Sequence, residues 1–141
     1  NESTEQGLLT PGETLGTVAF EGWTVGTTTC YDLRFPALYR ELVDRGAELI
    51  LVPSAWPYPR VEHWRVLPRA RAIENLAYVA AVNGVGRFES AALLGRSSVY
   101  DPWGTQVASR GDEAGVLTAE IDREVVQNRR SEFPALADRR L

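Results

Sequence analysis

The chain has 141 residues, of which 44% are hydrophobic and 24% charged, with a formal net charge of −4. This composition is typical of a single soluble domain, and the acidic balance argues against a nucleic-acid partner, because phosphate binding needs clustered cations. No apolar run is long enough to span a membrane, the polar first residues do not resemble a signal peptide, and one cysteine cannot form an internal disulfide. We therefore expect a cytoplasmic protein that binds neither nucleic acid nor membranes.

The first half of the chain alternates short apolar runs with one helical segment. Residues 18–20 and 23–29 are predicted to form two strands, because Glu21-Gly22 between them suits a tight turn. A helix is predicted over 36–45, since proline suits its first turn and a glycine follows its last residue. The continuous apolar run over 49–52 is typical of a strand that is covered on both faces.

The second half begins with a longer helical segment that contains a proline. Proline inside a helix removes a hydrogen bond and crowds the preceding turn, so we expect Pro68 to kink this helix or to shift its start. In chain order we predict a helix over 61–76, a strand over 78–82, a loop over 84–94, a hairpin of strands over 97–100 and 105–108, a strand over 116–121 and a short helix over 124–130.

Alternation of strands and helices followed by hairpin strands favours a layered α/β fold with an apolar central sheet. Such a sheet normally carries helices on both faces, but the two clearly predicted helices here can cover only one face. We therefore expect half of a larger sheet, or a sheet completed by a partner. One domain is predicted over 1–122, followed by a C-terminal helix and an Arg-rich tail over 123–141.

Cys30 is the only cysteine, and it lies between a predicted strand and a predicted helix. A thiol at the start of a helix, at the carboxyl edge of an α/β sheet, suits a nucleophile, because that edge collects ligand and catalytic groups. A buried core cysteine is the other interpretation, and it is the commonest fate of a lone cysteine. The local pattern leaves both open.

The string Cys30-Tyr31-Asp32-Leu33-Arg34-Phe35-Pro36 resembles the nucleophile motif of the nitrilase, or carbon–nitrogen hydrolase, superfamily, and most of all its omega-amidase and deaminated-glutathione amidase branch. Further matches follow in the family's order. They are Val52-Pro53-Ser54-Ala55-Trp56, His63-Trp64, Arg69-Ala70-Arg71-Ala72-Ile73-Glu74-Asn75, Tyr78-Val79 with Asn83, Gly95-Arg96-Ser97-Ser98, Asp101-Pro102-Trp103-Gly104 and Glu120-Ile121-Asp122. The resemblance implies the α-β-β-α sandwich of the carbon–nitrogen hydrolases, incomplete here, with only the C-terminal half of its sheet and helices.

The resemblance also implies a reaction: a cysteine attacks an amide or nitrile carbon, ammonia leaves, and water hydrolyses the thioester, with a lysine and two glutamates assisting. Carried over, Cys30 is the nucleophile, and the backbone N–H of Tyr31 is a donor to the oxyanion. Glu5 corresponds to the second glutamate if the Pro-Gly turn aligns without gaps. Glu2 competes with it if the loop has an insertion, and a solvated terminal carboxylate is the other interpretation of Glu5.

The family's lysine and general-base glutamate would both lie before Asn1. All fifteen Lys-plus-Arg positions of the chain are arginine, and it has no methionine. We therefore expect a truncated reading frame or a processed piece with little activity alone, because losing each group should cost orders of magnitude in rate. A half sheet with an unpaired edge is also expected to aggregate or to need a partner.

Two residues are candidates for substrate binding. Trp56 either walls the pocket or packs on the loop prolines at its rim. Arg34 either binds a substrate carboxylate through its guanidinium or pairs with a nearby acid that holds the turn, and Asp32 has the same ambiguity. His63, the only histidine, is predicted to be structural, because this chemistry uses carboxylates.

The function implied by the resemblance is hydrolysis of a small linear amide, such as the omega-amide of a dicarboxylic acid, by a homo-oligomeric enzyme. No cofactor is implied, and one histidine with one cysteine makes a transition-metal cluster unexpected. Two alternatives remain at this stage. One is nitrile hydrolysis, carbamoyl hydrolysis or acyl transfer on the same fold, and the other is an inactive, non-enzymatic remnant of it.

Overall fold

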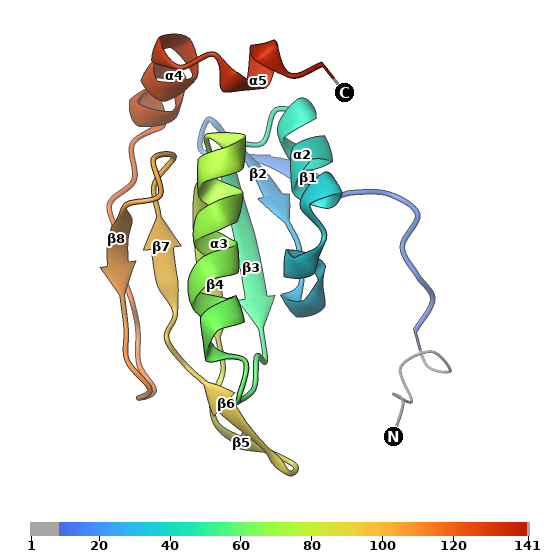
Figure 1. Cartoon of the computed structure of the whole chain (residues 1–141), viewed down its shortest axis with the longest axis vertical. Coiled ribbons are helices and arrows are strands. Elements are labelled where there is room, and N and C mark those ends of the chain that lie inside the picture. Colours follow the sequence, from blue (N-terminus) through green and yellow to red (C-terminus); the bar gives the residue numbers. More distant parts are fainter. Residues whose placement is uncertain (1–8, 141) are drawn as a thin grey trace.

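The computed structural model describes residues 9–140, which centre on a six-stranded mixed sheet (Figure 1). The strand order is β1-β2-β3-β4-β7-β8. β2, β3 and β4 run parallel, and the other neighbouring pairs are antiparallel. The bounds are Thr17–Phe20 for β1, Trp23–Thr27 for β2, Leu49–Ser54 for β3, Tyr78–Asn83 for β4, Ser98–Tyr100 for β7 and Gln106–Ser109 for β8.

Two helices lie on one face of this sheet, and the remaining elements lie at its ends (Figure 1). The face is covered by α2 (Pro36–Asp44) and α3 (Val61–Asn75). One end carries α4 (Arg123–Glu132) and α5 (Ala135–Asp138), and the other carries a hairpin of β5 (Val85–Phe88) and β6 (Ala91–Leu94). No helix within residues 9–140 is both long and apolar enough to cross a membrane.

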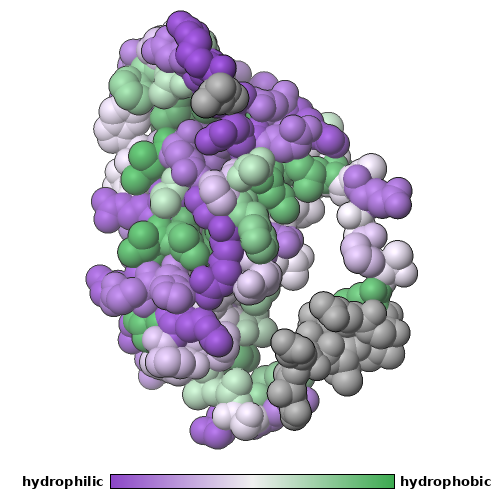
Figure 2. Space-filling view, turned by 45° about the vertical axis from the view of Figure 1, so that its right-hand side comes forward, coloured by the Kyte–Doolittle hydropathy of each residue, from purple (hydrophilic) through white to green (hydrophobic). Residues whose placement is uncertain are grey.

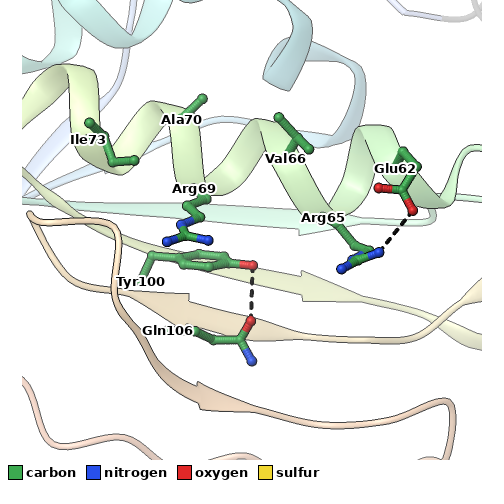
Figure 3. A pocket seen from close by; sticks show the side chains of 8 residues that line it. All are labelled: Glu62, Arg65, Val66, Arg69, Ala70, Ile73, Tyr100 and Gln106. Atoms are coloured by element: carbon green, nitrogen blue, oxygen red, sulfur yellow. Dashed lines mark hydrogen bonds and ion pairs between the residues drawn. The ribbon is translucent and has the colours of Figure 1, made fainter.

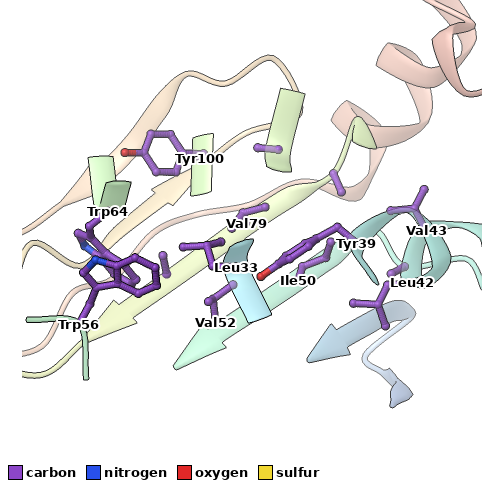
Figure 4. Close-up of a cluster of buried hydrophobic side chains, with 14 of the residues drawn as sticks. Leu33, Tyr39, Leu42, Val43, Ile50, Val52, Trp56, Trp64, Val79 and Tyr100 are labelled. Carbon is purple, nitrogen blue, oxygen red and sulfur yellow. The ribbon is translucent and has the colours of Figure 1, made fainter. Parts of the chain in front are cut away.

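Burial on the helix-covered face follows the two-residue period of the strands. Ile50 and Val52 of β3 and Val79 of β4 are fully buried there, under Tyr39 and Leu42 of α2 (Figure 4). Pro68 is also fully buried, and α3 is continuous across it from Val61. Of the two predicted effects, a kink or a shifted start, the shifted start is therefore wrong, and burial of the proline ring favours its place in the helix.

The opposite side of the sheet is apolar and mostly open, although Val25 and Tyr78, which the register places on it, are buried. Val18 and Phe20 of β1 are 56% and 65% exposed, Leu51 of β3 is 38% exposed and Val82 of β4 is 59% exposed. The strand register places these four side chains on one side, which we call the bare face. The continuous apolar run over 49–52 therefore has a covering layer on one side only within the described residues.

Helix α4 is attached to the backbone of buried residues that precede β3 and β4. Arg130 of α4 donates to the carbonyl oxygens of Leu76 at 3.0 Å and of Ala47 at 2.7 Å, and its burial lowers its pKa. Arg123 pairs with the buried Glu48 at 2.7 Å. Two arginines of this segment are therefore packed against the body of the molecule. The predicted division at residue 122 falls where α4 begins, and it stays a prediction.

Two predicted elements differ from the structure. The loop predicted over 84–94 is the β5–β6 hairpin. β5 is mostly exposed and contains a glycine, and β6 is apolar throughout, so neither strand shows a clear alternation of apolar and polar residues. The strand predicted over 116–121 is absent, and Val116 is largely exposed. An apolar run forms a strand only where a neighbour supplies backbone hydrogen bonds, and this segment has no paired strand within residues 9–140.

Residues 9–14 are exposed and stand away from the body of the molecule (Figure 2). They precede β1 and lead toward the segment that contains Glu5, which lies outside the described residues. The structure therefore does not place the second glutamate predicted from the sequence.

Candidate active site

Cys30 lies just beyond the carboxyl end of β2, at the first position of a five-residue 3₁₀ helix, η1 (Cys30–Arg34). Its φ of 45° is left-handed, a conformation that non-glycine residues adopt rarely and that clusters at functional sites. The turn is closed by Asp32, whose carboxylate accepts from the N–H of Thr29 at 2.9 Å. Asp32 therefore caps the turn in this structure.

A buried arginine holds the other end of this turn. Arg71 of α3 is 5% exposed and donates from Nε and Nη2 to the carbonyl oxygen of Leu33, at 3.1 and 2.8 Å. The same guanidinium pairs with Glu74 at 2.8 Å and lies 5.2 Å from the ring centre of Tyr39. These contacts fix the turn that carries Cys30 against the core, because a buried charge is stable only when its donors are used.

Tyr39 supports the strand side of the same turn. Its hydroxyl lies 2.7 Å from the hydroxyl of Thr28, which directly follows β2. Burial raises the pKa of Tyr39 to about 12, so the phenol is neutral at physiological pH. The neutral pair links α2 to the residues that lead into Cys30.

Cys30 opens into a small cavity of about 210 Å³. Its lining consists of one thiol, two aromatic side chains, two arginines and a proline, and no carboxylate: Cys30, Tyr31, Arg34, Trp56, Pro57 and Arg60. Trp56 follows β3, the neighbour of the strand that leads to Cys30. The carboxyl ends of adjacent parallel strands thus bring these residues together, as expected for an open α/β sheet.

Trp56 is held rigidly as a wall of this cavity. Its N–H donates to Oδ1 of Asn83 at 2.6 Å, and Asn83 donates back to the Trp56 carbonyl at 3.2 Å. The indole N–H donates to the carbonyl of Arg60 at 3.2 Å, and the ring packs against Trp64. Trp56 is 2% exposed, so it forms part of the interior and does not sit at an exposed rim.

Arg34 lies over the aromatic rings of the cavity. Its guanidinium carbon is 4.9 Å from the ring centre of Trp56 and 5.6 Å from that of Tyr31. One guanidinium nitrogen lies 3.2 Å from Nδ1 of His63, within hydrogen-bond distance. No acidic side chain within residues 9–140 forms an ion pair with Arg34.

The backbone N–H of Tyr31 lies in the first turn of η1, where helical N–H groups lack intrahelical acceptors. Its side chain is largely exposed and packs edge-on against Phe35. The geometry thus leaves a backbone donor beside the thiol.

Two residues at this site were given no role from the sequence, although Asn83 is part of the quoted motifs. Asn83 ends β4, and its side chain joins the Trp56 loop to Gly95, to whose carbonyl it donates at 3.0 Å. Arg60 lines the cavity from the residue that precedes α3. The sequence could have indicated them only by their positions, because Asn83 ends a strand and Arg60 precedes a helix.

A larger cavity lies elsewhere, between α3 and the β7–β8 pair (Figure 3). It measures about 370 Å³ and includes the ion pair of Glu62 with Arg65 and the hydrogen bond between Tyr100 and Gln106. Its lining contains no cysteine, serine or histidine. Cys30 and its smaller cavity therefore form the better candidate for nucleophilic chemistry. Residues 9–140 contain no cluster of three potential metal ligands.

A family model described as carbon–nitrogen hydrolase matches residues 1–131. The chain belongs to the carbon–nitrogen hydrolase family. It is 37% identical over 130 residues to a 2-oxoglutaramate amidase of Bacillus subtilis, covering 92% of this chain and 50% of that protein. These matches confirm the predicted family, and with it the amidase branch to which the motifs pointed.

Solved structures of the carbon–nitrogen hydrolase family agree with the fold. Saccharomyces cerevisiae Nit3, a member of branch 10 of the nitrilase superfamily, matches with a TM-score of 0.88 and 34% identity over 97% of this chain and 51% of its own. An amidase mutant from Nesterenkonia sp. AN1 matches with a TM-score of 0.81 and 30% identity, over 95% and 52%. That structure shows the acetamide moiety of fluoroacetamide added covalently at its active-site cysteine. The predicted fold class is confirmed, and the chain spans about half the length of these relatives.

Proposed function

We propose that the chain supplies the nucleophile-bearing C-terminal half of an amidase, with Cys30 as the nucleophile. The observation that carries the proposal is the left-handed backbone conformation of Cys30, which follows a parallel strand and lines a cavity together with Trp56. Membership of the carbon–nitrogen hydrolase family supports it, as does the covalently modified cysteine of the Nesterenkonia amidase.

The proposed reaction has two steps. The sulfur of Cys30 bonds to the amide carbon, the C–N bond breaks, and ammonia leaves with that electron pair and a proton. Water then attacks the thioester carbon, the C–S bond breaks, and the sulfur regains a proton as the carboxylic acid departs. Splitting the hydrolysis in this way replaces one difficult step by two easier ones.

The other residues have supporting roles in this proposal. The N–H of Tyr31 donates to the oxyanion that forms in each step, together with a lysine that we expect before residue 1. Glu5 serves as the second glutamate. The indole ring of Trp56 packs against the substrate, and the guanidinium of Arg34 contributes positive charge to the cavity. The substrate is a small linear amide, and ammonia is a product.

The proposed assembly is a homo-oligomer that packs through its helix-bearing side. Val66 and Ile73 of α3 are exposed there, and Figure 2 shows hydrophobic side chains among hydrophilic ones on this side of the molecule. Exposed apolar groups of this kind favour protein contacts. Light scattering of the purified protein would measure its mass, and a monomer would contradict this part of the proposal.

Ammonia release from linear omega-amides tests the activity, using protein expressed from the complete reading frame that contains these residues. We expect Cys30→Ala and Cys30→Ser to lower kcat/KM by at least about 10³-fold. Ser109→Ala, on exposed β8, is the matched control and should retain wild-type activity. Alkylation by fluoroacetamide should map to Cys30. Full activity in Cys30→Ala would overturn the proposal. If the wild-type protein releases no ammonia and its Cys30 reacts no faster than a free thiol, the non-enzymatic alternative would be favoured.

A further inference from the structure

Asn83 joins three segments of the chain beside the Cys30 cavity, although it does not line that cavity. It is 7% exposed, and both polar atoms of its side-chain amide are used. Oδ1 accepts from the N–H of Trp56 at 2.6 Å, and Nδ2 donates to the carbonyls of Trp56 at 3.2 Å and of Gly95 at 3.0 Å. Its own backbone N–H donates to the hydroxyl of Ser97 at 3.0 Å. The end of β4 is thereby tied to the segments that follow β3 and β6.

The loop that carries Trp56 also pairs with the β5–β6 hairpin. The N–H of Leu94 donates to the carbonyl of Trp56 at 2.9 Å, and the N–H of Tyr58 donates to the carbonyl of Ala92 at 2.9 Å. These two strands form a small sheet of their own, separate from the six-stranded sheet. Asn83 belongs to the six-stranded sheet, from which η1 also extends. Its side chain therefore sets the place of this loop relative to the sheet that bears the nucleophile turn.

The three backbone partners of the Asn83 side chain require an amide at this position. The N–H of Trp56 is a donor and the two carbonyls are acceptors, so the side chain must offer one acceptor and two donors. An aspartate of the same size would lack the donors. An apolar side chain would leave all three backbone groups without this partner in the interior, which is unfavourable.

We propose that Asn83 is a positioning residue for the reaction at Cys30, which acts by holding Trp56 where its indole ring packs against the substrate. A wall that is already in place need not be ordered when the substrate binds, so binding is tighter. The Cys30 turn itself is held separately, by the hydrogen bonds from Arg71 to the carbonyl of Leu33. Loss of the Asn83 amide should therefore weaken substrate binding more than it slows the chemical steps. This proposal rests on the amidase function proposed above.

The test measures KM and kcat for glutaramic acid, a linear omega-amide, with protein from the complete reading frame. We expect Asn83→Ala to raise KM by about 10-fold and to change kcat by less than about 3-fold. Asn83→Gln keeps the amide and should recover part of the loss. A merely structural role would lower the fraction of folded enzyme, which reduces kcat and leaves KM unchanged.

The matched control is Asn75→Ala. Asn75 is 2% exposed, and its amide donates to the carbonyl of Arg71 at 2.9 Å, within α3. It is thus a buried asparagine with a backbone partner, and it does not contact the Trp56 loop. This variant should leave KM for glutaramic acid within about 2-fold of the wild-type value.

Hydrogen–deuterium exchange of the same variants gives a readout that is independent of turnover. Asn83→Ala should speed exchange over residues 55–60 several-fold, and Asn75→Ala should leave it unchanged. Unchanged exchange in Asn83→Ala would overturn the proposal, and so would a loss that falls on kcat alone, although the amidase function would then stand. If the wild-type protein does not turn over glutaramic acid while Asn83→Ala still speeds this exchange, the amidase function alone is contradicted.

Discussion

The two faces of the six-stranded sheet differ in what covers them. Ile50 and Leu51 are neighbours in β3 and are similarly apolar, yet Ile50 is fully buried under the helices and Leu51 remains exposed on the bare face. The pattern repeats in β4, where Ala81 is buried and Val82 exposed. Strands of this composition are suited to burial on both sides. Within residues 9–140, helices thus cover one face of the sheet and no layer covers the other.

The uncovered face agrees with the family to which the chain belongs. The α-β-β-α sandwich predicted from the sequence requires a second sheet against the bare face, and the chain spans about half the length of its relatives. The helix-covered face also holds the residues that support Cys30, including Arg71 and Tyr39. We therefore expect the stability of the fold to depend more on side chains of the covered face than on those of the bare face.

The largest contrast is expected between Ile50→Ala and Leu51→Ala in the 141-residue chain. Deleting the buried Ile50 side chain should lower the free energy of unfolding by about 2–5 kcal/mol, through lost burial and a cavity. Leu51→Ala should cost less than about 1 kcal/mol, because its side chain is already partly hydrated. Urea unfolding measures both. Equal costs in this chain would contradict the difference between the faces.

The Ile50→Ala and Leu51→Ala variants should also be compared in protein expressed from the complete reading frame. If a second layer covers the bare face, Leu51→Ala should there become as costly as Ile50→Ala. A Leu51→Ala cost that stays small in the longer protein would mean that the bare face has no covering layer.

A smaller effect is expected from the arginine that holds the Cys30 turn on the covered side. Arg71→Ala removes two charge-assisted hydrogen bonds to Leu33 and should destabilise the fold by about 1.5–3 kcal/mol. Arg69→Ala changes an exposed arginine two residues away and should stay within about 0.5 kcal/mol of wild type. Thermal unfolding compares the two variants, and similar shifts in both would show that the Leu33 contact contributes nothing.

The smallest effect concerns pH and the buried phenol of Tyr39, whose pKa is raised from 10.0 to about 12 by burial. Below pH 10 both the folded and the unfolded chain keep the phenol proton. Between pH 10 and about 12 the unfolded chain loses it first, so the free energy of unfolding falls as pH rises. Tyr39→Phe should cost about 1 kcal/mol near neutral pH, from the lost contact with Thr28. Tyr39→Phe should also reduce the fall in the free energy of unfolding between pH 10 and about 12, as measured by urea unfolding. An unchanged fall would show that other groups cause it.

The central strands and the two long helices were predictable because strong local signals agree with burial. Pro36 and the glycine after α2 mark that helix, and the run over 49–52 marks β3. The β5–β6 hairpin was missed because β5 is mostly exposed and contains a glycine, while β6 is apolar throughout, so neither strand has a clear two-residue period. The strand over 116–121 was predicted wrongly because apolar residues alone do not reveal whether a neighbouring strand exists.

The candidate site was predictable only where a motif or the sheet's polarity placed the residue. Cys30 and Trp56 follow adjacent parallel strands, so their proximity follows from topology. The path of the Trp56 loop depends on Asn83, which lies 27 positions further along the chain. Such a long-range contact leaves no local pattern, and for that reason Arg60, whose place depends on this loop, was not identified from the sequence.

The most direct test of the central claim, that Cys30 carries amide hydrolysis, is intact-mass analysis of the enzyme quenched during turnover of an omega-amide. The protein should be expressed from its complete reading frame. We expect a fraction of the enzyme to gain the mass of the substrate minus ammonia, and peptide mapping to place that acyl group on Cys30. Ammonia release with no adduct at Cys30, continuing unchanged in Cys30→Ala, would contradict the claim.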